Sequence, residues 1–149
     1  VCIKKIIKLK NKYKILINVN KKQKIFFIKS IFESNLKNIR FIGKVDNVVP
    51  LIAICDILIF AGCTPHFPRP VYEAWALKKP IVAFDMDGIS DNIENDIDGV
   101  IVNENTCYGL SNAIPSVNSR MGKNGYKKAM ERFDMNKNIE KIIKIYGEI

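Results

Sequence analysis

The chain has 149 residues, of which 48% are hydrophobic, and its formal net charge is +9 at pH 7. This length is sufficient for one domain with its own core, so neither disulfides nor a structural metal is needed for stability. The charge permits phosphates, nucleotides, nucleic acid or an acidic membrane as partners. It selects none of them, because much of it comes from lysines in an Ile- and Asn-rich chain.

The cysteines argue against a zinc site and against a disulfide framework. They lie at positions 2, 55, 63 and 107 without a C-x-x-C pair, and the chain has one histidine. We therefore expect no metal site, a cytoplasmic location, and Cys55 in the core because it lies in an apolar run. The longest apolar stretch, residues 50–63, is interrupted by Asp56 and is too short to span a bilayer.

Short apolar runs alternate with helical patterns along the chain. The runs predict strands at residues 14–19, 38–43, 56–60, 81–84 and 99–102. Helices are expected at residues 22–32, 48–55, 70–78 and 90–94, and from 107 onward with stops near Gly122 and Phe133. The last helical piece, residues 138–149, has apolar residues at three- and four-residue spacing, so we expect one face to pack on the body.

Strands this apolar are typical of a parallel sheet that is covered on both faces. The regular alternation predicts an α/β fold, with a doubly wound, Rossmann-like sheet and helices on both faces. Trp75 is expected in the core. Lys78 and Lys79 precede a strand, so we expect them at the sheet edge away from any ligand and in contact with solvent.

Ligands of open α/β sheets bind outside the carboxyl ends of the strands. The loop after the third predicted strand leads into a helix that starts at Pro70, a residue suited to a first helical turn. The N–H groups of such a turn can bind a phosphate, and the carboxylate of Glu73, one turn in, can accept hydrogen bonds from two ribose hydroxyls. This combination predicts a nucleotide pocket, although the helix dipole alone also favours an acidic residue there.

The chain, most tightly from Asn38 to Val102, resembles the C-terminal domain of the family 4 glycosyltransferases, which have the GT-B fold. The resemblance rests on "FIGKVDNVVPLIAICDILIF", on "FPRPVYEAWALKKPIVAFDMDGISD" with its Glu-Ala-x-Ala-x-x-x-Pro core, on "NDIDGVIV" and on "MGKNGYKKAMERFDMNKNIEKIIKIY". It covers nearly the whole chain and implies one half of a GT-B fold. It also implies transfer of a sugar from a UDP- or GDP-sugar to a glycan or lipid acceptor, with retention at the anomeric carbon and without a cofactor.

The resemblance implies a role for individual residues. Glu73 would bind the ribose hydroxyls, and backbone groups of Arg69, Pro70 and Val71 would line the phosphates. Backbone near Lys44 and Val45 would meet the base, and Asp87 and Gly88 would border the donor sugar. The Arg69 side chain can also clamp a diphosphate, with a solvated loop arginine as the alternative.

His66 is the candidate catalytic residue. It is the only histidine, and imidazole can donate to a phosphate or a sugar hydroxyl near neutral pH. An exposed loop histidine is the alternative reading of the same residue.

The chain departs from the family pattern at several positions. Pro65 stands where the first of two glutamates is expected, Pro68 where a glycine follows the aromatic residue, and Asp87 in place of the first residue of a Gly-Gly loop. The resemblance also places the first strand of the domain and the whole N-terminal domain before Val1. We therefore expect residues 1–149 to be a single C-terminal-type domain, as a fragment, a degenerate homologue or one half of a split enzyme, with an N-terminal GT-B domain as partner.

Three other readings remain open. The chain can be a non-catalytic module that binds a nucleotide sugar or a partner subunit, or half of a nucleotide-sugar epimerase, although an epimerase is expected to show more catalytic acids and histidines. The basic segment 3–14 can dock peripherally on an anionic membrane. Nucleic acid is not expected as a partner, since the strands are apolar and carry no interleaved aromatic and basic residues.

Overall fold

The computed structural model describes residues 15–17, 39–42, 45–62 and 67–148. The predicted helix at residues 22–32 and the basic segment 3–14 lie outside the described residues.

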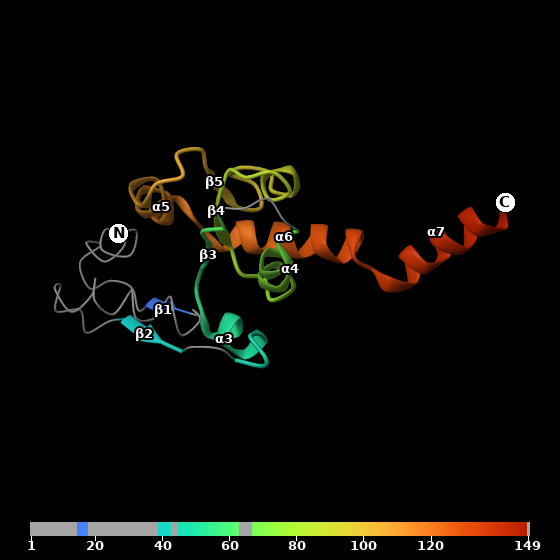
Figure 1. The fold of residues 1–149 in the computed structure, drawn as a ribbon, viewed down its shortest axis with the longest axis horizontal. Coiled ribbons are helices and arrows are strands. Elements are labelled where there is room, and N and C mark those ends of the chain that lie inside the picture. Colours follow the sequence, from blue (N-terminus) through green and yellow to red (C-terminus); the bar gives the residue numbers. More distant parts are fainter. Residues whose placement is uncertain (1–14, 18–38, 43–44, 63–66, 149) are drawn as a thin grey trace.

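The described chain alternates short strands and helices (Figure 1). The strands are β1 (Ile15–Ile17), β2 (Ile39–Phe41), β3 (Leu58–Phe60), β4 (Ile81–Phe84) and β5 (Val100–Val102). The helices are α3 (Val49–Ile54), α4 (Arg69–Ala76), α5 (Cys107–Ala113), α6 (Ser119–Arg132) and α7 (Met135–Gly147), with single 3₁₀ turns η1 (Ser90–Asn92) and η2 (Ile114–Ser116). Each of the five predicted strands therefore contains an observed strand.

The strands pair in parallel, as their apolar sequences predict. β1 pairs with β2, and a second sheet has the strand order β3-β4-β5. In this second sheet Ile59 lies opposite Val82, and Ala83 lies opposite Ile101. Parallel neighbours require crossover connections, and α4 supplies the one between β3 and β4.

The core is built on the two faces of β4. The first and third residues of this strand pack in the cluster that contains Trp75 of α4, and the second and fourth pack in the cluster that contains Leu110 of α5. All four side chains are buried, because helices cover the sheet on both faces. This arrangement confirms the doubly wound α/β fold.

Helix α6 lies against α4 at two glycines. A Cβ at Gly125 would overlap the Trp75 ring, and a Cβ at Gly122 would overlap the carbonyl of Lys78. Trp75 is fully buried, as predicted, and its Nε1 donates to the carbonyl of Asp98 at 2.9 Å. The predicted helix stop at Gly122 is wrong, because this glycine permits close helix packing inside an unbroken α6. The stop predicted at Phe133 is confirmed, since Phe133 is the C-cap of α6.

Two predictions about burial are corrected. Helix α7 leads away from the sheet (Figure 1), and none of its described side chains is buried, so its apolar face does not pack on the body. Ile142 and Ile143 are 53% and 64% exposed. Cys55, expected in the core, is only partly buried because it lies at the end of the short helix α3.

Candidate functional site

The carboxyl ends of β3 and β4 lie at one edge of the sheet. Phe60 is in register with Ala83, so the loop after β3 and the loop at residues 85–88 after β4 leave the sheet as neighbours. The first loop leads into α4 and the second into η1. The edge therefore receives the start of α4 and the Asp87–Gly88 turn, two of the three segments to which the resemblance gives a role in donor binding.

The backbone at the start of α4 is already hydrogen-bonded. The N–H of Arg69 donates to the carbonyl of Phe67, and the N–H of Val71 donates to the carbonyl of Pro68, both at 2.9 Å. Pro70 has no N–H to donate. The positive group that this turn presents to solvent is consequently the Arg69 guanidinium rather than a set of free backbone donors.

Glu73 lies one turn into α4, on the side that is not packed in the core. Its side chain is 27% exposed, and Oε1 lies 3.7 Å from Nε of Arg69, whose side chain is 83% exposed. Because the Arg69 side chain of this ion pair is exposed, the pair contributes little to stability. The carboxylate is therefore held at the sheet edge with acceptor capacity to spare.

The Asp87–Gly88 turn has a fixed backbone. Gly88 has a φ of 77°, a conformation that side chains disfavour. Its N–H donates to Oδ2 of Asp91 at 3.0 Å, and its carbonyl accepts from Nδ2 of Asn92 at 3.0 Å. The exposed carboxylate of Asp87 is carried on a turn that both of these bonds hold in place.

A group of aromatic rings borders the start of α4, and the sequence analysis missed it. Phe67 stacks on Tyr72 with ring centroids 4.8 Å apart, and the ring of Phe133 meets Tyr72 edge-on at 4.4 Å. Tyr72 is 9% exposed, and its buried hydroxyl has no hydrogen-bond partner in the described part of the chain. Burial raises the pKa of Tyr72, and the nearby charge of Arg132 opposes this rise. Only the helical spacing of Tyr72 after Pro68 could have indicated a buried ring, since the contact with Phe133 is long-range.

Of the other predicted site residues, Val45 precedes α3, and Lys44 and His66 are not among the described residues. Val45 is partly buried in the stretch that leads into the helix. The predicted base contact and the candidate catalytic role therefore stay predictions.

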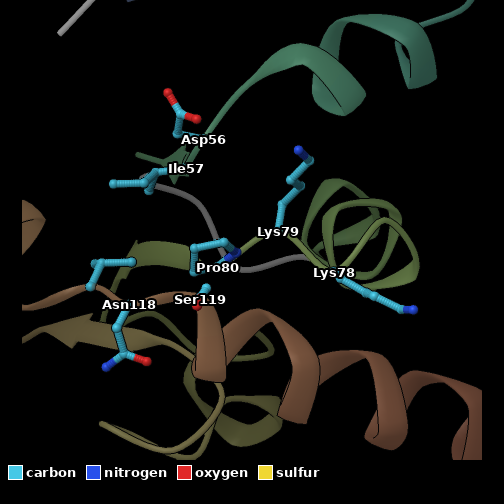
Figure 2. A pocket seen from close by; sticks show the side chains of 8 residues that line it. Asp56, Ile57, Lys78, Lys79, Pro80, Asn118 and Ser119 are labelled. Carbon is cyan, nitrogen blue, oxygen red and sulfur yellow. The ribbon is translucent and has the colours of Figure 1, made fainter.

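The opposite edge of the sheet carries an open pocket of about 350 Å³ (Figure 2). Its lining comes from the residues that precede β3 and β4 and from the segment that enters α6, and these are Asp56, Ile57, Lys78, Lys79, Pro80, Val117, Asn118 and Ser119. Lys78 and Lys79 thus lie at the amino ends of the strands, as predicted. Lys78 is not simply solvated, because its ammonium group lies 4.7 Å from the centroid of the Tyr126 ring.

None of the helices in the described part is both long and apolar enough to cross a bilayer. Within residues 15–17, 39–42, 45–62 and 67–148, no three His, Cys, Asp or Glu side chains gather as metal ligands would.

Comparison with known proteins identifies the family. A family model described as "Glycosyl transferases group 1" matches residues 3–118. The chain is 26% identical over 117 residues to N,N'-diacetylbacillosaminyl-diphospho-undecaprenol alpha-1,3-N-acetylgalactosaminyltransferase of Campylobacter jejuni, and this match covers 74% of the chain and 31% of that enzyme.

Solved structures show the same fold at low sequence identity. HepE of Anabaena in complex with UDP superposes with a TM-score of 0.88 at 19% identity, over 99% of this chain and 44% of HepE. HepE in complex with UDP-glucose gives a TM-score of 0.82 at 20% identity over the same shares. The chain thus spans less than half the length of these relatives. Because the family model covers most of its length, the chain belongs to the group 1 glycosyl transferases, with the fold of the C-terminal half of a GT-B enzyme.

Proposed function

We propose that this chain is the donor-binding half of a retaining glycosyltransferase, and that it binds the nucleoside diphosphate of a UDP- or GDP-sugar at the carboxyl edge of β3 and β4. The observation that carries the proposal is the partly buried Glu73 carboxylate, one turn into the helix that begins at this edge. Family membership supports it, as do the structures of HepE with UDP and with UDP-glucose.

In this proposal Glu73 accepts hydrogen bonds from the ribose hydroxyls, and the Arg69 guanidinium turns to the diphosphate. The exposed pair between the two side chains contributes about 0–1 kcal/mol, so a donor can separate them at small cost. The N–H groups of Arg69 and Val71 can reach a phosphate only by exchanging their bonds to the preceding carbonyls. The sugar then lies near Asp87 and Gly88, on the neighbouring loop.

The proposal includes a partner, an N-terminal GT-B domain in the same or another chain. The relatives are more than twice as long as the part that the chain covers, which supports a second half. The exposed apolar side of α7, with Met135, Ile139, Ile142, Ile143 and Tyr146, offers a surface for it. Such a surface is unusual on a helix that has no partner.

The strand order supports one more strand in this sheet, the first strand of the domain that the resemblance implies. In a doubly wound sheet of order 3-2-1-4-5-6, the first strand lies between the second and the fourth. Here β1 pairs with β2, β3 begins a separate ladder, and β1 lies on the side of β2 that faces β3 (Figure 1). We therefore place the expected first strand between β1 and β3, supplied from outside the described residues.

A second candidate is a non-catalytic module that binds a nucleotide sugar or a partner subunit. The exposed face of α7 fits this reading as well, and Pro65 in place of the first family glutamate favours it. We further propose a cytoplasmic protein. Residues 3–14 lie outside the described residues, so membrane docking through this segment stays a prediction.

Titration of the 149-residue chain with UDP and GDP, followed by NMR, tests the proposed function. We expect weak binding, with shifts at Gly43–Val45, His66–Glu73 and Asp85–Gly88. Hydrogen bonds to a charged acceptor contribute about 1.5–3 kcal/mol each, in part offset by desolvation, so Glu73→Ala should cost about 2–3 kcal/mol, a loss of roughly 30- to over 100-fold. Glu140→Ala, which removes an exposed carboxylate from α7, is the control. Equal binding by Glu73→Ala, or shifts at the Lys78 pocket, would contradict the proposal.

A further inference from the structure

The end of α6 is hydrogen-bonded to the Gly88 turn through one side chain. Nη1 of Arg132, the last residue of α6, donates to Oδ1 of Asn92 at 3.2 Å. Nδ2 of the same Asn92 donates to the carbonyl of Gly88 at 3.0 Å. The Asn92 amide is thus shared between the turn and the helix, and Arg132 fixes which way this amide points.

The next residue along the chain reaches the other loop. The ring of Phe133 lies 4.4 Å from the ring of Tyr72 and 6.3 Å from that of Phe67, edge-on to both. Phe67 and Tyr72 flank the Pro68–Pro70 start of α4, and Tyr72 directly precedes Glu73. Two consecutive residues of the α6–α7 junction therefore contact the two loops separately, one through hydrogen bonds and one through ring packing.

The Arg132 contact is not what holds α6 on the body. The helix is already packed against α4 at Gly122 and Gly125, and Lys128 forms an ion pair with the buried carboxylate of Asp98. Arg132 is exposed, so its bond to Asn92 adds little to this anchoring. The bond between Arg132 and Asn92 contributes little to stability, yet it fixes a loop of the proposed donor site. Donor binding therefore explains this bond better than stability does.

We propose that Arg132 and Phe133 are positioning residues for the sugar donor, with Arg132 holding the Gly88 turn against the sugar and Phe133 holding the start of α4 against the nucleotide. This inference rests on the proposed function. Neither side chain needs to touch the donor, because each acts through the loop that it contacts. Because the two residues act on different loops, their removal should change the affinities for the nucleotide and the nucleotide sugar differently. A general loss of stability would not produce this difference.

The test compares two ligands on each variant of the 149-residue chain. NMR titrations give the affinities for UDP and for UDP-glucose, or for GDP and GDP-glucose if GDP binds the parent more tightly. Arg132→Ala should weaken the nucleotide sugar about two- to tenfold and leave the bare nucleotide within about twofold, the scale of one lost hydrogen bond. Phe133→Leu should weaken both ligands by a similar factor of about two to ten and leave their ratio unchanged, the scale of one aromatic pair.

Matched controls come from the same helix. Arg120→Ala removes the same charge from the other end of α6, and Met130→Leu alters a side chain that is 45% exposed, as Phe133 is. Both controls should bind like the parent. Asn92→Ala should reproduce the effect of Arg132→Ala, and combining the two should add nothing further, because the two residues form one chain of hydrogen bonds.

The failures of the two proposals are distinguishable. If the parent binds both ligands and Arg132→Ala keeps their ratio, or if Arg120→Ala changes it equally, the positioning role is overturned and the donor site stands. The positioning role is also overturned if Phe133→Leu binds like the parent. A parent chain that binds no nucleotide overturns the proposed function, and the positioning role with it.

Discussion

Nε of Arg69 lies 3.7 Å from Oε1 of Glu73, one turn apart on α4. The order of the two charges is the less favourable one for a helix, because a cation at the first position meets the positive end of the helix dipole. Helix stability therefore does not account for an arginine here. An anion bound at the start of α4 would account for it, and would draw the guanidinium away from Glu73.

Arg69→Ala is accordingly expected to separate stability from binding. The free energy of unfolding should change by less than about 0.5 kcal/mol, since an exposed pair in this orientation contributes almost nothing. The affinity for UDP should fall about tenfold or more, because a charge-assisted contact to the diphosphate is lost. Urea denaturation and NMR titration measure the two quantities. A substantial loss of stability with unchanged UDP affinity would show that Arg69 serves the helix.

Gly125→Ala should destabilise the fold. Its Cβ would overlap the Trp75 ring, which is fully buried and whose Nε1 is bonded to the Asp98 carbonyl. Overpacking of this kind costs about 1–3 kcal/mol, which urea denaturation can measure. Gly147→Ala is the matched control, since no atom lies within 4 Å of its added Cβ. It should cause no loss, because alanine is the better helix former. Equal stability of the two variants would mean that α6 does not depend on close contact with Trp75.

Tyr72→Phe tests the Tyr72 hydroxyl, which has no hydrogen-bond partner among the described residues. At pH 7 the variant should be at least as stable as the parent, because a buried hydroxyl without a hydrogen bond is itself costly. Burial raises the pKa of Tyr72 in the folded chain, so the unfolded chain loses its proton first as the pH rises. The contribution of Tyr72 to the free energy of unfolding is complete below the ordinary tyrosine pKa of about 10. It is lost as the pH rises through the higher pKa that Tyr72 has in the folded chain.

The parent should therefore lose stability above about pH 10 more steeply than Tyr72→Phe does. Thermal unfolding followed across this range measures the difference. Tyr146→Phe alters a tyrosine that is 75% exposed on α7 and should keep the slope of the parent. A slope unchanged by Tyr72→Phe would place the alkaline titration elsewhere.

The isolated chain should not catalyse sugar transfer. A cleft between two domains positions the acceptor and excludes water, and one half provides neither. Incubation with labelled nucleotide sugars and with lipid or glycan acceptors should give no transfer above background. Addition of an N-terminal GT-B domain that docks on α7 should restore it. Robust transfer by the chain alone would refute the need for a second half.

The sequence by itself determined the strands, the fold class and the family, because these depend on local patterns. The all-apolar run Ile81–Phe84 predicts a strand covered on both faces, and it is buried throughout. Pro70 in the first turn and Glu73 one turn later follow from spacing alone, and α4 places both there.

Only the tertiary structure decided what depends on contacts between distant residues. Gly122 has the local signature of a helix stop, yet it lies inside an unbroken α6. A glycine is needed there because the backbone at Lys78 approaches too closely for a side chain. The helical spacing of α7 predicts an apolar face, but spacing cannot state what covers it, and α7 is exposed. Likewise, the link from Arg132 through Asn92 to Gly88 joins residues far apart in the chain, and packing of α6 on α4 brings them together.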